Sequence, residues 1–467
     1  MSERSGFRMG KSAGNILAVL VLGASLLYWF HTVGEPWLRP SPPASQSEWV
    51  QALNQHRSLD ENGKGKVFFG AAKGCNLIMI QLESLQNFML YASIQGQQVT
   101  PVLNRLARES LYFPYIFQQI GRGNTSDAEF ISNTSLYPIG GKAMSEAFGD
   151  RIIPSLPRLL KTSGYTSRTF HVNEASFWNR DELYPALGFD QYYDKPYFPA
   201  TSFNHFGASD EELFRVGIQK IRSFRERGQK FYTQFVTVSS HSPFVIPKKM
   251  KRIKLTKDLD KTRLGDYIHA IHYADYALGT FIEQLKRSGV WDESVVVVYG
   301  DHFGLNRQLH KPEEVSKALG VPYHEPISRL NVPLIIHLPG QEQGRVIERT
   351  GGQMDILPTL ANLMGIDLVQ RKFTVFGQDL LNVKHHLVGG RYYLPEGSFF
   401  KNEVLFIPGK NGFRDGRAVS LRTFQAIEDR TSLKEDYESV LRLLKQSDSF
   451  VKQLPRRSEN IAIHRTP

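Results

Sequence analysis

The amino-acid sequence predicts an α/β fold with a mostly parallel central sheet and helices on both faces. Short apolar runs of the kind that form buried parallel strands alternate with helical patterns, and this alternation indicates successive βαβ units. The apolar runs are Leu77–Ile80, Tyr165–Phe170, Phe231–Val238, Val295–Tyr299 and Leu334–His337. From Ile268 to Arg287, apolar side chains recur on one helical face, and Gly289 ends this helix. A chain of 467 residues with 41% hydrophobic content is sufficient for such a core.

The N-terminal region predicts a membrane anchor. Residues 14–33 are almost wholly apolar and close to the ~20 residues that a helix needs to cross the hydrocarbon layer. Basic residues precede this segment, and the next one after Lys11 is Arg39. This bias predicts a cytoplasmic N-terminus, residues 1–13, and an extracytoplasmic remainder. A cleaved signal peptide is the alternative, although the residues that follow make a poor cleavage site.

The rest of the chain divides into three predicted parts. Residues 34–72 begin with several prolines and are predicted to be an extracytoplasmic linker. Residues 73–430 hold the α/β pattern and are the predicted catalytic domain. Residues 431–467 are predicted to form a C-terminal helix and tail, because an amphipathic pattern runs from about Leu433 to Leu454.

Composition restricts the chemistry. Cys75 is the single cysteine, so any metal must be held by oxygen and imidazole, and no intramolecular disulfide can form. The net charge of +11 suits phospholipid, a phosphate-rich polymer or nucleic acid, but we find no nucleic-acid motif and expect no nucleic-acid partner. One short cluster is basic: Lys248, Lys249, Lys251, Arg252 and Lys254. It favours a solvated loop, with contact to anionic lipid headgroups as the alternative.

Polar residues follow two of the predicted strands. Glu83 comes directly after the strand that begins at Leu77, and Asp301 and His302 lie in a glycine-flanked turn after Val295–Tyr299. Ligands in α/β sheets collect beyond the carboxyl ends of the strands, and carboxylate and imidazole suit a divalent cation. The two strand ends could therefore face one site.

The segment Gly121–Phe130 combines glycines, hydroxyl residues and acids at a predicted helix start. A hydroxyl at a helix N-terminus lies where backbone N–H groups and the helix dipole favour negative charge. Phosphate can bind there and a developing alkoxide can be stabilised, which makes Thr125 a candidate nucleophile. In the alternative, Thr125 or Ser126 is an ordinary N-cap.

Two further sets of polar residues are expected to be structural. The first shares the predicted helix, where packing and hydrogen bonding are favoured over a metal site because no strand end brings its members together. This set is His269, His272 and Asp275. Asp355, in the segment Gln353–Thr359, is expected to support the fold.

Several sequence blocks stand in a fixed order along the chain. They are Gln81–Leu85, Gly123–Phe130, His171 with Ser176–Asp181, Ser240–Phe244 and Tyr299–Gly304. In this order they resemble the catalytic domain of the lipoteichoic acid synthase family. The resemblance covers residues 75 to 430 and implies the fold of the alkaline phosphatase and sulfatase superfamily, which agrees with the predicted strands.

The resemblance implies a role for each residue that it matches. It implies ligands for one divalent ion, Mn²⁺ or else Mg²⁺: Glu83, Thr125, Asp301 and His302. It implies a second set around the phosphoglycerol group: His171, Trp178, Arg180 and His241. Considered alone, Trp178 would be a packing residue, Arg180 a surface ion-pair partner and His241 a loop residue.

The activity that the resemblance implies is phosphoglycerol transfer at the outer face of a bacterial membrane. The donor would be phosphatidylglycerol, the acceptor a glycolipid or a polyglycerol-phosphate chain, and Thr125 would carry the covalent intermediate. A phosphoethanolamine transferase is the closest alternative, although its periplasmic domain usually carries disulfides. Another phosphodiesterase of the superfamily and a non-catalytic headgroup-binding module are also considered. The family's synthases have several membrane spans where one is predicted here, so a processive synthase, a primase and an accessory transferase all stay open.

Overall fold

The computed structural model describes residues 66–199, 203–306 and 310–457. The predicted cytoplasmic segment, the membrane anchor and most of the linker, at positions 1–65, lie outside these residues. Within the described ranges, no helix has both the length and the apolar character that a membrane span needs.

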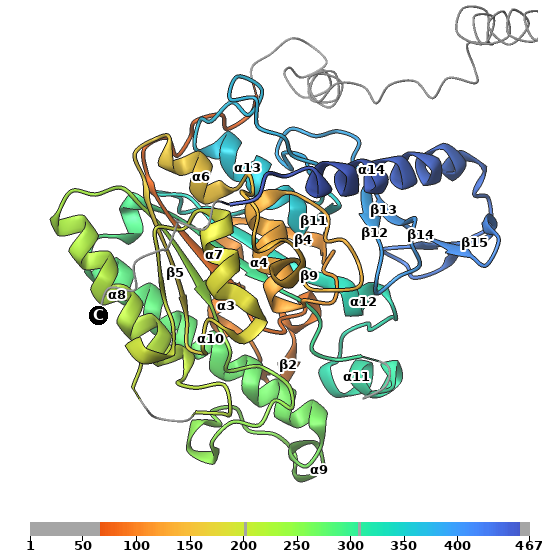
Figure 1. Cartoon of the computed structure of the whole chain (residues 1–467). Helices are drawn as coiled ribbons and strands as arrows, with labels where there is room; N and C mark the ends of the chain where they lie inside the picture. The colour runs from red at the N-terminus through yellow and green to blue at the C-terminus, as the bar shows by residue number, and fades with distance from the viewer. Residues whose placement is uncertain (1–65, 200–202, 307–309, 458–467) are drawn as a thin grey trace, which may run out of the picture. The chain divides into compact units, whose positions relative to one another are not determined.

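A nine-stranded sheet lies at the centre of the described residues (Figure 1). Its strand order is β10-β4-β9-β8-β1-β7-β5-β6, and β11 pairs with β4. The five predicted apolar runs fall on its strands, except for Tyr165, Thr237 and Val238 at the ends of two runs. The strand bounds are β1 (Asn76–Leu82), β4 (Leu111–Phe117), β5 (Thr166–His171), β6 (Gln191–Tyr193), β7 (Phe231–Val236), β8 (Ser294–Gly300), β9 (Asn331–His337), β10 (Arg345–Val346) and β11 (Gly351–Gly352).

The sheet is mixed because one strand runs against the others. β1 pairs in parallel with β7 and β8, and β5 pairs in parallel with β6 and β7. β9 is antiparallel to both of its neighbours, β8 and β4. The prediction of a parallel strand at Leu334–His337 is therefore wrong in direction. An apolar run indicates that a strand is buried on both faces, and β9 is buried in this way after its first residue. The run does not indicate the direction of the strand.

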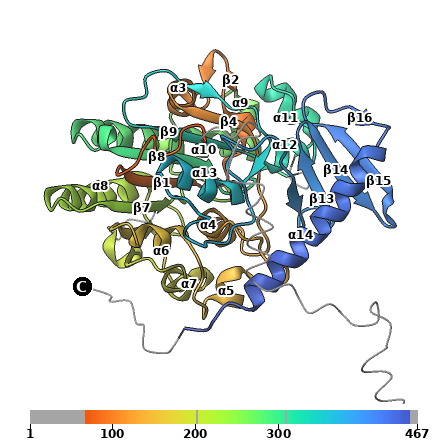
Figure 2. The ribbon, with the colours of Figure 1, turned by 90° about the horizontal axis from the view of Figure 1, so that it is seen from above.

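Helices cover both faces of the sheet, as predicted (Figure 2). One face carries α3 (Pro101–Glu109), α8 (Asp210–Glu226) and α10 (Arg263–Arg287). The other carries α4 (Thr125–Thr134), α6 (Leu156–Lys161), α7 (Arg180–Leu187) and α13 (Ile356–Leu363). Helix α10 starts earlier than its apolar pattern because Thr262 Oγ1 caps it by accepting a hydrogen bond from Gly265 N at 3.0 Å. It ends before Gly289, whose φ is +70°.

A five-stranded antiparallel sheet, which the sequence patterns did not predict, follows the central one. Its strands are β12 (Val388–Gly390), β13 (Ser398–Lys401), β14 (Val404–Gly409), β15 (Gly412–Ser420) and β16 (Ala426–Ile427). Helix α14 (Lys434–Lys452) packs against β12 and β13 and confirms the predicted C-terminal helix. The domain limits at residues 73 and 430 stay predictions. The remaining short elements are β2 (Ser93–Ile94), β3 (Gln97–Gln98), α5 (Met144–Phe148), α9 (Lys257–Asp260), α11 (Pro312–Leu319) and α12 (Ile327–Leu330).

Candidate active site

Strand ends that point the same way meet at one edge of the central sheet. Because β1, β5, β7 and β8 are mutually parallel, their carboxyl ends share this edge. Glu83 follows β1, His171 ends β5, His241 follows β7, and Asp301 and His302 follow β8. The edge therefore collects carboxylates and imidazoles from widely separated parts of the chain.

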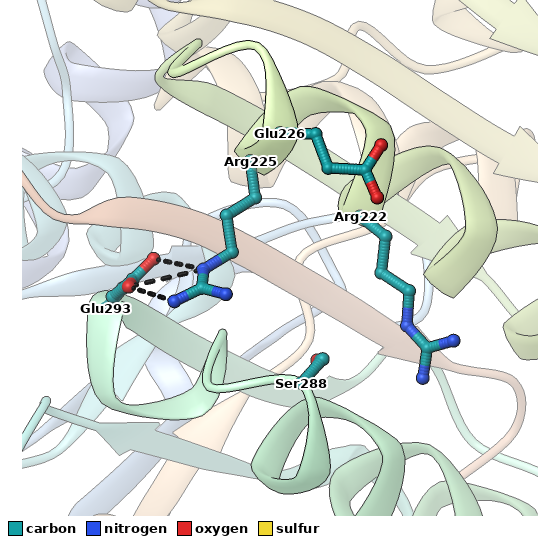
Figure 3. A pocket seen from close by; sticks show the side chains of 5 residues that line it. All are labelled: Arg222, Arg225, Glu226, Ser288 and Glu293. Atoms are coloured by element: carbon teal, nitrogen blue, oxygen red, sulfur yellow. Dashed lines mark hydrogen bonds and ion pairs between the residues drawn. The ribbon is translucent and has the colours of Figure 1, made fainter.

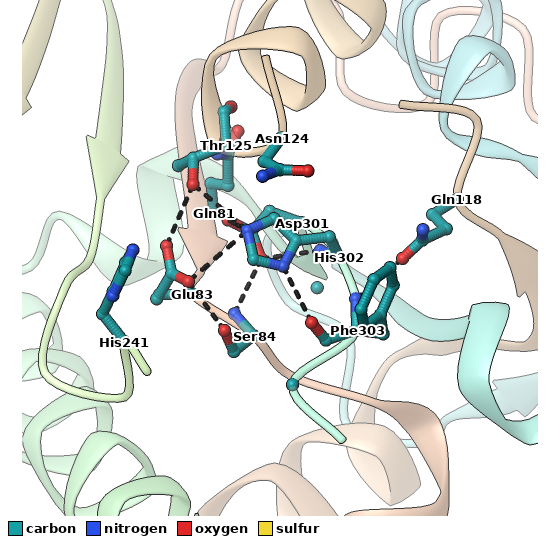
Figure 4. A network of polar contacts seen from close by, with 12 residues as sticks. Gln81, Glu83, Ser84, Gln118, Asn124, Thr125, His241, Asp301, His302 and Phe303 are labelled. Carbon is teal, nitrogen blue, oxygen red and sulfur yellow. Dashed lines mark hydrogen bonds and ion pairs between the residues drawn. The ribbon is translucent and has the colours of Figure 1, made fainter. Parts of the chain in front are cut away.

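Three of these residues form a potential cation site with the predicted nucleophile. Glu83, Asp301 and His302 present ligand atoms within 4.8 Å of one another, and no other group of this kind occurs in the described part of the chain. Thr125 Oγ1 lies 3.1 Å from Glu83 Oε2 and 3.2 Å from His302 Nε2 (Figure 4). The structure thus brings together all four residues of the predicted ligand set.

The orientation of these side chains fits a divalent cation. Ser84 N and His302 N donate to Asp301 Oδ1 at 2.7 and 2.6 Å, while Asp301 Oδ2 is buried with no hydrogen-bond donor among the described residues. His302 Nδ1 lies 3.0 Å from the Phe303 carbonyl oxygen, while Nε2 faces Thr125 and the two carboxyl groups. A buried oxygen without a donor is costly, and a cation held by oxygen and imidazole ligands would satisfy it.

Burial and the neighbouring groups shift the pKa values of the two carboxyl groups in opposite directions. Burial disfavours the charged form of Glu83, yet His302, His241 and hydrogen bonds from Ser84 and Thr125 hold its pKa below the usual range. Burial and the neighbouring Glu83 raise the pKa of Asp301 well above its usual range. A bound divalent cation would favour the charged form of both groups.

The backbone at Thr125 is held by a chain of two hydrogen bonds. Gln81 Nε2 donates to the Thr125 carbonyl oxygen at 3.0 Å, and the Tyr299 hydroxyl donates to Gln81 Oε1 at 2.5 Å. Thr125 is the first residue of α4, whose N-cap is Asn124, so the prediction of Thr125 or Ser126 as an ordinary N-cap is wrong.

The glycine-rich loop before Thr125 is organised by Asp127. Gly121 N and Gly123 N donate to Asp127 Oδ2 at 3.0 and 2.9 Å, and Met144 N donates to Oδ1 at 2.9 Å. A Cβ at Gly123 would lie 2.5 Å from Asp127 Oδ1, so this position requires glycine. The loop therefore folds tightly over the helix N-terminus.

The sequence patterns missed Asn124. Its φ of 44° and ψ of −112° are rare for a residue other than glycine, and such strain is concentrated at functional sites. Its Oδ1 accepts a hydrogen bond from the Tyr393 hydroxyl at 2.6 Å. The sequence places this residue directly before the candidate nucleophile, but its strained conformation and its contact with Tyr393 are visible only in the structure.

Arg180 is buried in an ion pair. Its Nε donates to Glu129 Oε1 at 2.7 Å, and both side chains are 1% exposed, so the alternative of a surface pair is wrong. Glu129 Oε2 also accepts a hydrogen bond from the Tyr184 hydroxyl at 2.9 Å. Arg180 Nη2 is buried without a hydrogen-bond partner among the described residues. The sequence patterns missed Glu129, one helical turn after Thr125, because acids in a helix are usually solvated.

The other predicted phosphoglycerol contacts lie around the same edge. His171 Nδ1 lies 3.0 Å from the Val236 carbonyl oxygen, and burial together with Arg180 lowers the pKa of His171 to about 3, so its imidazole is neutral. Trp178 is half-buried at the start of an aromatic series. Its ring centroid lies 5.8 Å from that of Phe177, Phe177 lies 5.9 Å from Phe206, and Phe206 lies 4.1 Å from His241. This series of ring contacts connects Trp178 to His241 at the edge of the sheet that holds the candidate site.

The residues predicted to be structural have structural partners. His269 Nε2 lies 2.6 Å from Asp260 Oδ1, and His272 Nδ1 lies 2.8 Å from the Val99 carbonyl oxygen. Asp275 accepts hydrogen bonds from the first turn of α3, at Val102 N and Leu103 N. Asp355 likewise accepts hydrogen bonds from backbone N–H groups, including that of Gly352.

Two cavities lie at different ends of the sheet. One of about 360 Å³ is lined by His241, Val245 and neighbouring residues, and it adjoins the candidate site. Another of about 520 Å³ lies where α8 and α10 end and β8 begins, which is the opposite edge (Figure 3). There, Arg225 is paired with Glu293 at 2.8 Å, and none of the candidate site residues lines it.

Comparison with known proteins agrees with this geometry. The family model described as Sulfatase matches residues 75–366. Lipoteichoic acid synthase 2 of Bacillus subtilis is 33% identical over 414 residues, which cover 87% of this chain and 61% of that protein. The lipoteichoic acid synthase-like protein YvgJ of the same species is 32% identical over 440 residues, which cover 91% of this chain and 68% of that protein.

A solved structure extends the similarity to three dimensions. The crystal structure of the lipoteichoic acid synthase LtaP from Listeria monocytogenes has a TM-score of 0.82 and 41% identity, and the match covers 88% of this chain and 100% of that one. The chain spans less than two thirds of the length of lipoteichoic acid synthase 2. These matches and the order of the site residues show that the chain belongs to the sulfatase family and is a homologue of the lipoteichoic acid synthases.

Proposed function

We propose that this chain is a metal-dependent phosphoglycerol transferase that moves glycerol phosphate from phosphatidylglycerol to a glycolipid or polyglycerol-phosphate acceptor. The observation that carries the proposal is the position of Thr125 Oγ1, between Glu83 Oε2 and His302 Nε2 at the N-terminus of α4. The homology to lipoteichoic acid synthases supports the substrate class. We further propose that residues 14–33 anchor the chain in the cell membrane, with residues 73–430 as the extracytoplasmic catalytic domain and residues 431–467 as its C-terminal helix and tail.

One divalent cation, Mn²⁺ in preference to Mg²⁺, would be held by the four gathered residues. These ligands are Glu83, Thr125, Asp301 and His302. When bound, the ion would supply the positive charge that lowers the pKa of the Thr125 hydroxyl and draws electron density from the phosphate. Asp301 Oδ2 supports this assignment because no protein donor in the described ranges satisfies it.

In the first half-reaction, Thr125 displaces diacylglycerol. Its Oγ1 forms a bond to the donor phosphorus, and the bond between phosphorus and the diacylglycerol oxygen breaks. Glu83 Oε2, 3.1 Å away, accepts the hydroxyl proton. The released oxygen takes up a proton, for which the imidazole of His241 is placed beside Glu83 (Figure 4).

In the second half-reaction, the acceptor hydroxyl attacks the phosphorus of the phosphoglycerol-threonine. A new oxygen–phosphorus bond forms and the bond to Thr125 breaks. His241 takes the acceptor proton, and Glu83 returns to the threonine oxygen the proton that it took in the first half-reaction. The same residues serve both halves because the steps mirror each other. The phosphodiester of the donor is replaced by a phosphodiester in the product, so no water is consumed.

The buried cation of Arg180 supports binding of the phosphate. Its Nη2 has no protein partner among the described residues and would donate to a phosphate oxygen, while Glu129 fixes the guanidinium. The neutral His171 would add a contact through the ring nitrogen that Val236 does not engage. Trp178 would contact the glycerol. All three contacts are proposals.

Replacing the nucleophile tests the proposal. Full-length Thr125→Ala should release no diacylglycerol from phosphatidylglycerol in the presence of Mn²⁺. Thr134→Ala is the matched control, because that hydroxyl lies at the other end of α4, where it donates to the Phe130 carbonyl oxygen and accepts from Leu136 N. Undiminished turnover in Thr125→Ala would remove the central claim. Release from phosphatidylethanolamine alone would assign the phosphoethanolamine transferase activity instead.

A further inference from the structure

One surface segment carries much of the chain's positive charge. Lys248–Arg263, here called the basic segment, holds eight Lys and Arg residues against two Asp residues. It therefore contributes a charge of +6 to the chain's total of +11. An excess this local attracts an anionic partner more strongly than a dispersed charge does.

Most of this charge is not neutralised by the protein. Lys251 lies 3.3 Å from Asp260 and 3.5 Å from Asp266, so these two nearby acids are already paired with Lys251. The structure, where it describes the chain, shows no ion-pair partner for three exposed lysines of the segment: Lys248, Lys249 and Lys254. Their ammonium groups are therefore available to an external anion.

An exposed apolar residue lies directly before the basic segment. Val245 is 59% exposed, although its neighbours Phe244 and Ile246 are buried. The two buried neighbours anchor the loop, so Val245 is held at the surface. It also lines the cavity of about 360 Å³ that begins at His241. Val245 therefore lies between the start of the basic segment and the cavity that His241 lines.

We propose that Val245 and the basic segment seat this domain on the surface of an anionic lipid bilayer. An apolar side chain beside unpaired lysines suits an interface with apolar chains below anionic headgroups. A soluble polyanion would engage the lysines but gain nothing from Val245. The cavity then lies between the bilayer and His241, on the route that a lipid donor would take. This inference rests on the proposed function in taking that donor from the bilayer.

An environment-sensitive fluorophore at position 245 tests the location directly. The probe is attached to Val245→Cys in a full-length chain that also carries Cys75→Ser, since Cys75 is the single native cysteine. With phosphatidylcholine vesicles that contain phosphatidylglycerol, we expect a blue shift of emission that pure phosphatidylcholine does not produce. The matched probe site is Val346→Cys, which is 54% exposed on β10 and should show no shift.

Charge reversal provides the second arm. The triple variant K248E, K249E and K254E should lose the blue shift of the probe at 245. The control triple K410E, K434E and K445E makes the same charge change on exposed lysines near the second sheet and should retain it. The shift should persist when Thr125→Ala is added, so a failure of the proposed chemistry and a failure of membrane seating give different results.

Three results would overturn the proposal. The first is no blue shift at 245 with anionic vesicles. The second is a shift that survives the reversal of Lys248, Lys249 and Lys254. The third is an equal shift produced by soluble polyphosphate without vesicles, which would assign the basic segment to a polyanionic chain.

Discussion

Arg180 Nε donates a hydrogen bond to Glu129 Oε1 at 2.7 Å inside the protein, where each side chain is 1% exposed. Glu129 lies one helical turn after Thr125 in α4, and Arg180 is the first residue of α7. The ion pair therefore ties the helix that carries the candidate nucleophile to the segment proposed to bind the phosphate. Several measurable consequences follow from this and from the other contacts of the site.

Removing the buried acid should destabilise the fold. Glu129→Gln leaves the guanidinium of Arg180 buried without its counter-charge, which typically costs about 3–5 kcal/mol in the free energy of unfolding. Urea unfolding followed by circular dichroism measures the change. Glu293→Gln, which breaks the exposed pair with Arg225, is the control and should leave the midpoint unchanged. Equal midpoints for wild type and Glu129→Gln would show that the buried pair adds no stability.

Adding one methyl group to the glycine-rich loop should impair turnover. In Gly123→Ala the new Cβ would lie 2.5 Å from Asp127 Oδ1 and 2.9 Å from Ala143 Cβ, so the loop must shift. A displacement of Thr125 by about 1 Å can reduce kcat on the order of 100-fold. Gly140→Ala serves as control, because a Cβ at that position would have no atom within 4 Å. If both variants kept wild-type kcat, the loop would not be positioning the nucleophile.

Neutralising one proposed ligand should weaken cation binding. Asp301→Asn keeps the size of the side chain but removes the carboxylate whose Oδ2 lacks a protein donor in the described residues. Loss of supporting contacts alone costs about 10–100-fold in metal affinity, so loss of a ligand should cost at least as much. Mn²⁺ titration followed by electron paramagnetic resonance measures it. Asp292→Asn, at an exposed position, should bind Mn²⁺ as the wild type does, and equal affinity in both variants would exclude Asp301 as a ligand.

The neutral state of His171 should make the fold sensitive to acid. Burial is the main cause that lowers the pKa of His171 to about 3, and the positive charge of Arg180 is the second. In the unfolded chain the imidazole has a pKa of about 6.5. The unfolded state therefore binds the extra proton first, and stability that is present above pH 6.5 is lost as the pH falls toward 3. Between pH 6.5 and 5, His171 should lower the free energy of unfolding by about 2 kcal/mol.

Replacing His171 by a neutral side chain should remove that contribution. In His171→Gln, the loss of unfolding free energy between pH 6.5 and 5 should be smaller than in the wild type by that amount. The exposed imidazole of His205 provides the control, since His205→Gln should retain the wild-type slope. An unchanged slope in His171→Gln would mean that this imidazole is not kept neutral by the fold.

The strands and helices that could be predicted are those whose apolar residues show which of their faces are buried. The runs that became β1, β7 and β8 are largely apolar because helices cover both faces of the sheet, and the amphipathic pattern indicated α10. The direction of β9 could not be predicted, because its burial is the same in either direction. β4 contains Pro114 and partly exposed positions, which weaken its strand pattern.

The candidate site was predictable where chemistry follows a strand end. Glu83, Asp301 and His302 stand directly after β1 and β8, so a common edge was a natural expectation, and the ordered sequence blocks added Thr125. Asn124 and Glu129 escaped because their significance lies in a backbone conformation and in burial. Neither property has a local sequence pattern.

The hydrogen bond from Tyr393 to Asn124 links the candidate active site to a residue beyond those that match the sulfatase family. A chain cut at residue 366 would retain every proposed metal ligand but would lose the tyrosine that holds the residue before the nucleophile. It would also lose the whole five-stranded sheet and helix α14, which packs against β12 and β13. We therefore expect the five-stranded sheet and α14 to support Asn124, directly before the candidate nucleophile, and expression fragments should include residues up to at least Lys452.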